Sequence, residues 1–226
     1  MELNSKLAVL DQIYKIYDGF VAKLNMACKK YCAGCCTRNV TLTTLEGYLI
    51  TTHMISYGKS SLFKNIEGVI PKKRFQPLTT TNKLADICMK GEDPPEEKHE
   101  DSDGCCPLLK DNLCSIYPVR PFGCRCFVSI KDCRKQGYAE VDPFILSVNN
   151  LFLQFIEHVD SQGFSGNLID VLKFMESKTN RRNYKMNTLN IPDTGLIPNL
   201  KIKVLMIPPE HRVKITPMLK ALQNII

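Results

Sequence analysis

The sequence CCPLLKDNLCSIYPVRPFGCR, residues 105–125, decides how this chain must fold. It holds four of the chain's eleven cysteines within twenty-one residues. Pro107, Pro118 and Pro121 fix the backbone angle φ and keep the stretch out of regular helix. A packed helix or strand does not need so many small, reactive side chains in one place. We therefore expect a rigid loop that points its thiols inward toward a bound group.

A second cysteine group, CKKYCAGCC, lies upstream at residues 28–36. Its spacing is C-x3-C-x2-C-C. Because successive side chains diverge, adjacent Cys35 and Cys36 fit one mononuclear ion poorly. Either one of the pair is a spectator or the site holds more than one metal. The two groups together give seven candidate ligands: Cys28, Cys32, Cys35, Cys36, Cys106, Cys114 and Cys124.

Cysteine thiolates select zinc, copper(I) and iron–sulfur clusters. Seven thiols exceed what one tetrahedral zinc can use, so two metals, or one cluster with a second site, account for them better. The histidines are few and distant in sequence, which favours an iron–sulfur cluster over zinc. The site would be structural or electron-transferring. For Cys105, Cys126 and Cys133, metal ligation and packing in the core are equally expected. Cys88 has no other cysteine nearby in the sequence and is expected to pack as a small apolar side chain.

Two arginines follow the downstream cysteines closely. Arg120 and Arg125 are expected to donate hydrogen bonds to sulfur from outside the ligand set and so to tune the centre. Binding of an anionic substrate, or a salt bridge to Glu46, are the alternatives. Glu46 itself stands three residues after Thr43, the spacing of a capping box, and we expect it to cap a helix that starts at Leu45.

The chain of 226 residues is long enough for one substantial core, so we expect a single domain over residues 1–226. No secretory signal or membrane span is evident, which predicts a cytoplasmic protein whose thiols stay reduced. An acidic, proline-containing stretch at about 91–104 is expected to be a mobile surface loop. The segment from about residue 180 reads as loosely organised.

Hydrophobic periodicity predicts a mostly α protein with minor β structure, an irregular helical domain built around the cysteine site. The expected helices cover about 5–28, 45 onward, 142–163 and 166–178, with a last helix from Pro217. Cys28 would continue the buried stripe of the first helix, and Gly34 would permit a tight turn after it. A short strand is expected at Lys201–Ile207. Residues 58–104 show little regular pattern.

A net charge of +7 could indicate nucleic-acid binding. The basic runs Lys72–Arg74 and Arg181–Arg182 are short and have little aromatic interleaving, so a solvated face is the better interpretation. We therefore expect no nucleic-acid partner and no membrane. The predicted partners are a metal ion or cluster and, beyond it, a protein partner or substrate.

The motif elements Cys106-Pro107-Leu108-Leu109, Cys114, Ile116-Tyr117, Arg120-Pro121 and Cys124-Arg125, together with the upstream group, resemble the YkgJ-type cysteine cluster family. The upstream group departs from the family by one residue between its first two cysteines. The resemblance implies a zinc- or iron-chelating domain. Relatives include flagellin lysine N-methylases, so it also implies an alternative: a methyltransferase-like enzyme that uses S-adenosylmethionine and the cluster. The pattern alone leaves enzymatic activity open.

Overall fold

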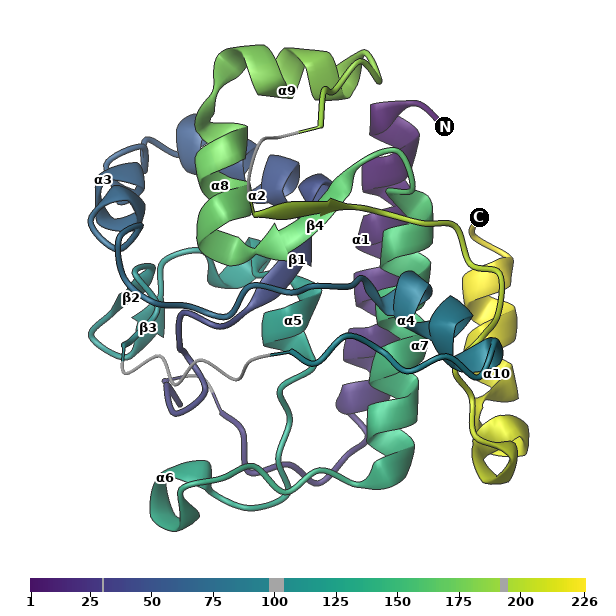
Figure 1. The fold of residues 1–226 in the computed structure, drawn as a ribbon. Coiled ribbons are helices and arrows are strands. Elements are labelled where there is room, and N and C mark those ends of the chain that lie inside the picture. The colour runs from purple at the N-terminus through teal and green to yellow at the C-terminus, as the bar shows by residue number, and fades with distance from the viewer. Residues whose placement is uncertain (30, 98–103, 192–194) are drawn as a thin grey trace.

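A computed structural model describes residues 1–29, 31–97, 104–191 and 195–226 (Figure 1). Most of the regular structure is helical, which confirms the predicted fold class. The helices are α1 Leu3–Val21, α2 Thr44–Ser56, α3 Leu62–Glu67, α4 Thr81–Met89, α5 Phe122–Arg125, α6 Cys133–Gln136, α7 Pro143–Val159, α8 Leu168–Glu176, α9 Lys178–Lys185 and α10 Arg212–Gln223, with short 3-10 turns η1 Tyr117–Val119 and η2 Pro209–His211.

Two small antiparallel sheets complete the fold. The first has the order β1–β4–β5. Its central strand β4, Phe164–Asn167, pairs with β1, Thr41–Thr43, on one side and with β5, Leu196–Pro198, on the other. The second is the hairpin of β2, Leu109–Lys110, with β3, Leu113–Cys114. β1 lies between Cys36 and α2, so the first sheet fastens the end of the upstream cysteine group to the body of the molecule.

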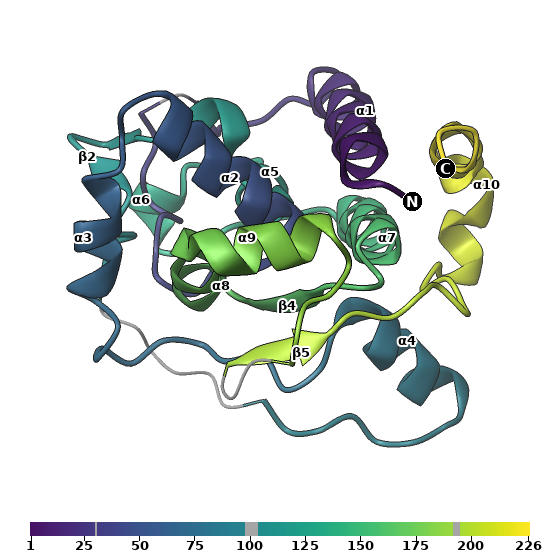
Figure 2. The same cartoon turned by 90° about the horizontal axis from the view of Figure 1, so that it is seen from above.

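One half of the core lies between α1, α7 and α10, which run side by side (Figure 2). At its centre the rings of Tyr17, Phe122 and Phe152 are fully buried. Tyr17 meets Phe122 edge-on at 4.7 Å between centroids, and Phe122 stacks on Phe152 at 5.7 Å. Aromatic pairs at these separations stabilise beyond the area they bury. Phe122 therefore anchors α5, the helix that carries Cys124, to the long helices.

The other half of the core packs β1, α2 and α8 against the downstream cysteine loop. Leu108 and Ile116 of that loop are almost completely buried, at 1% exposure each. They contact a set of aliphatic side chains, with Cys106, Cys114 and Cys124 at its margin. The loop is thus held by its apolar residues. Its thiols lie at the edge of the core rather than within it.

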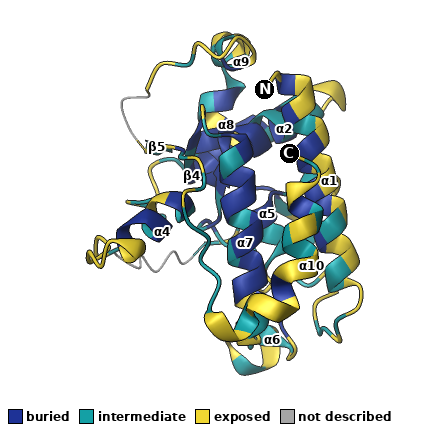
Figure 3. Cartoon of the chain, turned by 90° about the vertical axis from the view of Figure 1, so that its right-hand side faces the viewer, coloured by how far each residue is buried: buried dark blue, intermediate teal, exposed yellow. Residues whose placement is uncertain are grey.

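Helix α7 is the central element of the burial pattern (Figure 3). It begins as predicted, with Asp142 accepting from the Phe144 N–H and Pro143 in the first turn. At its other end Asp160, fully buried, accepts hydrogen bonds from the Thr44 hydroxyl at 2.7 Å and the Leu45 N–H at 2.9 Å. The end of α7 therefore fixes the start of α2.

Several predicted elements are placed differently. Helix α1 ends at Val21, so Cys28 does not continue its buried stripe, and the left-handed backbone of the upstream group is at Tyr31 (φ 71°) instead of Gly34. Residues 201–207 form no strand; the C-terminal strand is β5, because only that segment lies beside β4. The helix predicted at 166–178 is divided into the end of β4, α8 and the start of α9.

The segments described as poorly patterned also contain structure. Helices α3 and α4 lie within residues 58–104, and most of α9 and all of β5 and α10 lie beyond residue 180. Of the acidic stretch, residues 98–103 lie outside the described residues. Within the described part, no helix is both long and apolar enough to cross a membrane.

Candidate metal centre

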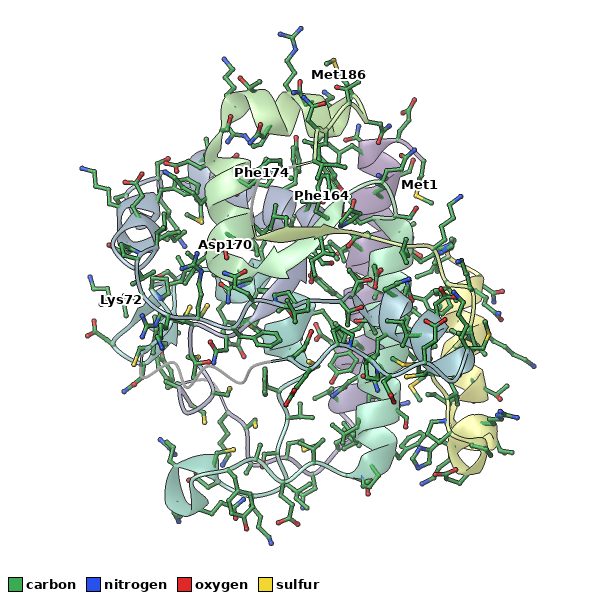
Figure 4. The ribbon with its side chains drawn as sticks, viewed as in Figure 1. Met1, Lys72, Phe164, Asp170, Phe174 and Met186 are labelled. Atoms are coloured by element: carbon green, nitrogen blue, oxygen red, sulfur yellow. The ribbon has the colours of Figure 1, made fainter. Side chains whose placement is uncertain are left out.

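The two cysteine groups meet at one cavity of about 270 Å³. Segments some seventy residues apart in sequence contribute to its wall, along with residues of the β2–β3 hairpin and α5. Figure 4 shows sulfur atoms distributed from that hairpin toward α6. All seven predicted ligand cysteines line the cavity: Cys28, Cys32, Cys35, Cys36, Cys106, Cys114 and Cys124.

Backbone pairing holds the two groups together. The Cys106 N–H donates to the Cys36 carbonyl at 2.9 Å, and Thr37 forms a β-bridge with Cys105. This contact places the adjacent thiols of the upstream group beside the first thiol of the downstream group. Nothing in the local sequence announces it, because a bridge between residues so far apart depends on the whole fold.

The β2–β3 hairpin delivers Cys114. Its turn residues Asp111 and Asn112 both have positive φ, 50° and 59°. Such a two-residue turn matches the twist of a hairpin, and Asp and Asn tolerate it better than most residues. Cys114 pairs with Leu109 in the register and so returns to Cys106. The Asp111–Asn112 pair is the feature of the sequence that predicts this hairpin, and the prolines alone do not predict it.

The downstream thiols are substantially buried. Burial raises the pKa of the Cys124 thiol well above its ordinary value, the pKa of Cys106 to about 11, and the pKa of Cys114 to a smaller extent. Cys36 is different: the Cys35 S–H donates to its sulfur, which lowers the pKa of Cys36. Burial therefore disfavours the thiolate at the three downstream cysteines, whereas the hydrogen bond from Cys35 favours it at Cys36.

Arg120 lies at the cavity wall, above the Tyr117 ring at 4.0 Å. Although burial dominates and raises the pKa of Cys114, the charges of Arg120 and Lys59 oppose that rise. Lys59 also donates to the Ser115 carbonyl at 2.8 Å. Sequence reasoning selected Arg120 but missed Lys59, which comes from the turn after α2, far from the motifs.

Arg125 is engaged in structural contacts. Its Nη1 pairs with Asp18 at 3.0 Å, its Nε donates to the Arg120 carbonyl, and its guanidinium lies 4.1 Å above the Tyr14 ring. The predicted alternative of a salt bridge from these arginines to Glu46 is therefore wrong, because Asp18 of α1 supplies the carboxylate. Arg125 still lines the cavity.

Glu46 is the predicted capping residue. The capping box with Thr43 is fully formed, and the Tyr14 hydroxyl also donates to the Glu46 carboxylate at 2.8 Å. The side chain is 2% exposed, and these contacts occupy it within the core. The prediction that Glu46 caps a helix is confirmed.

The remaining cysteines differ from one another. Cys126 packs against the α1–α7 core, where burial raises its pKa to about 12. Cys105 is exposed beside Thr37. Cys88 is exposed on α4, so the expectation that it packs as a core residue is wrong. Cys133 is half-buried at the first position of α6.

The two basic runs are solvated only in part, because one arginine of each is used within the fold. Arg74 forms a salt bridge with Asp170 of α8, and Arg181 donates to the Met175 carbonyl at 2.7 Å. The other residues of both runs are exposed, as predicted.

As the described side chains lie, no group of three or more His, Cys, Asp or Glu residues is arranged to hold a metal ion. The thiols face a common space without converging on one point. Comparison with family models, curated proteins and solved structures finds no match to this chain. Membership of the YkgJ-type family therefore stays a prediction from the motifs.

Proposed function

We propose that this chain binds a metal centre through the thiols of its two cysteine groups. The observation that carries the proposal is the shared cavity: seven cysteines from two distant segments line one space of about 270 Å³. Cysteines that pack only as small apolar side chains have no reason to gather around one cavity. Thiolates are soft ligands, and such ligands bind zinc or iron–sulfur clusters.

The donor set fits such a centre. Six of the seven cysteines that line the cavity are half-buried, so their side chains reach the cavity and remain accessible to an entering ion. Ligation requires the thiols to turn toward a common point, which the cavity leaves room for. A bound centre supplies either a covalent link between the two segments or a site of one-electron transfer.

An iron–sulfur cluster is the favoured occupant, and zinc is the alternative. Among the described residues that line the cavity there is no histidine, Asp or Glu, so sulfur is the ligand that they supply. Clusters of this kind are commonly held by cysteine thiolates alone. We propose a cytoplasmic location, where thiols remain reduced and free for metal.

The second candidate is a methyltransferase-like enzyme that binds S-adenosylmethionine at the centre. The cavity volume of about 270 Å³ favours metal binding alone. Pockets for drug-sized ligands typically occupy roughly 300–1,000 Å³. The cavity lies just below this range, so a metal centre alone fits it more readily than a metal centre together with a nucleoside.

The test is anaerobic purification followed by iron, sulfide and zinc analysis and an absorption spectrum. We expect bound iron and sulfide with broad visible absorption, or stoichiometric zinc in a colourless protein. The variant Cys106→Ser should bind less metal than the wild type, whereas Cys88→Ser, on the exposed face of α4, should bind the same amount. A wild-type protein that stays metal-free after anaerobic reconstitution with either metal overturns the proposal.

A further inference from the structure

Helix α6 brings an eighth thiol to the cysteine site. A side-chain carbon placed on Gly34 would lie 3.9 Å from the Cβ of Cys133 and 3.5 Å from the Cγ of Arg134. Gly34 immediately precedes Cys35. The first turn of α6 therefore packs directly on the upstream cysteine group, although nearly a hundred residues separate them.

The segment that leads into α6 also holds Cys28. The Ser129 N–H donates to the Cys28 sulfur at 3.3 Å, and the Ala27 N–H donates to the Ser129 carbonyl at 2.9 Å. Ser129 is 1% exposed, so this connection is firm. Cys133 follows four residues later. The chain thus fixes both Cys28 and Cys133 to one short segment.

Packing and backbone contacts divide the thiols into two sets of neighbours. Cys106, Cys114 and Cys124 pack against the same hydrophobic cluster, and the Cys106 N–H binds the Cys36 carbonyl to that set. Cys28 and Cys133 are instead held by the segment that contains Ser129, and Cys133 lies against the turn between Cys32 and Cys35.

We propose that the site holds two metal centres instead of one, each with four candidate thiol ligands. The inner centre, beside the aliphatic core, draws on Cys36, Cys106, Cys114 and Cys124. The outer centre, beside α6, draws on Cys28, Cys32, Cys35 and Cys133.

The division removes two difficulties of a single site. Four thiolates complete the tetrahedral shell of one zinc or hold one cluster, so eight thiols match two such centres. The adjacent pair also gains a reason, because Cys35 and Cys36 belong to different centres. In the metal-free chain the Cys35 S–H donates to the Cys36 sulfur, so the two thiols lie at the boundary between the two sets.

Arg134 lies beside the outer set. It follows Cys133 directly, its Cγ approaches Gly34, and its Nε pairs with Asp132 at 3.2 Å. A zinc ion with four thiolates has a net charge of about −2, and this arginine is a cation near that charge.

This inference rests on the proposed function. Zinc titration of the reduced, metal-free protein distinguishes failure of the two-centre inference from failure of the proposed function. We expect about two zinc ions per wild-type chain. Cys133→Ser should reduce the count to about one, and so should Cys114→Ser, which removes an inner ligand. The double variant should bind almost none. Cys88→Ser is the matched control and should keep both ions.

Cadmium-113 resonances identify which centre is lost. Each wild-type chain should give two resonances typical of sulfur ligation, and Cys133→Ser and Cys114→Ser should each remove a different one. Circular dichroism of each metal-free variant verifies that it is folded like the wild type. One zinc ion per wild-type chain, or two in Cys133→Ser, overturns the two-centre inference and leaves the proposed function standing. Absence of bound metal in every protein, both in this titration and after anaerobic reconstitution with iron and sulfide, overturns the proposed function itself.

Discussion

The carboxylate of Glu46 accepts a hydrogen bond from the backbone N–H of Phe122 at 2.7 Å. One residue therefore caps α2, binds α1 through Tyr14, and fixes the first turn of the helix that carries Cys124. A helix of four residues, as α5 is, has little stability of its own. Its position depends on this contact and on the aromatic packing of Phe122.

Replacing Glu46 with Gln tests this contact. The amide nitrogen of Gln would face donors where the carboxylate now accepts, so we expect the metal-free protein to lose about 2–4 kcal/mol of unfolding free energy. Urea unfolding measures the loss. Glu67→Gln, at an exposed ion pair with Lys173, is the control and should change stability by about 1 kcal/mol or less. Equal stability of Glu46→Gln and wild type would show that the cap is unimportant.

Replacing Phe122 with Ala should loosen both the core and the site. The ring is fully buried between Tyr17 and Phe152, and its removal leaves a cavity, so we expect a loss of about 3–5 kcal/mol. Thermal unfolding measures it, and alkylation of Cys124 should accelerate because α5 loses its anchor. Tyr138→Ala, at a residue 63% exposed, should alter neither quantity. Unchanged Cys124 reactivity in Phe122→Ala would contradict the anchoring role.

The buried carboxyl of Asp160 predicts a specific pH dependence. Burial raises its pKa to about 6, above the value of about 4 in an unfolded chain. Because the folded state keeps the proton longer, this group favours folding fully below pH 4, and that contribution is lost as the pH rises through 6. The loss amounts to about 3 kcal/mol.

Asp160→Asn removes this titration. The difference in unfolding free energy between wild type and Asp160→Asn should therefore fall as the pH rises from 4 to 7, while the thiols and other groups contribute equally to both proteins. Denaturant titrations at several pH values measure the difference. A difference that is constant over this range, or that grows, would contradict the assignment.

Arg120→Gln should make Cys114 less reactive. The arginine charge opposes the effect of burial on the Cys114 pKa, so its removal raises that pKa and decreases the thiolate fraction at pH 8. We expect alkylation of Cys114 to slow by about two- to fivefold, measured for each cysteine by peptide mass spectrometry. Arg125→Gln provides the comparison, since that arginine pairs with Asp18. The proposed role of Arg120 fails if both variants alkylate Cys114 at the same rate.

Local signals in the sequence predicted local structure well. Thr43 and Glu46 are three residues apart, and Asp142 and Pro143 are adjacent, so the starts of α2 and α7 follow from neighbouring residues alone. The clustering of cysteines likewise predicted that two segments share a site, since thiols at such density indicate a common ligand. All seven candidates line one cavity.

Features that depend on residues far apart in the sequence could not be predicted from such local signals. β4 is the short sequence FSGN, and it becomes a strand because Thr41–Thr43 and Leu196–Pro198 lie on either side of it. The end of α1 at Val21 has no glycine or proline to mark it. The pairing of Arg125 with Asp18, and the approach of Cys133 to Gly34, join residues about a hundred positions apart. Only the assembled fold determines them.

The bond from the Cys106 N–H to the Cys36 carbonyl has a consequence for synthesis of the chain. A ribosome produces the upstream cysteines well before the downstream ones, so the nascent chain presents its first four thiols without their partners. Under the proposed function, metal captured at that moment would bind an incomplete set of ligands. Loading of the proposed centres would therefore await release of the segment that ends with α6.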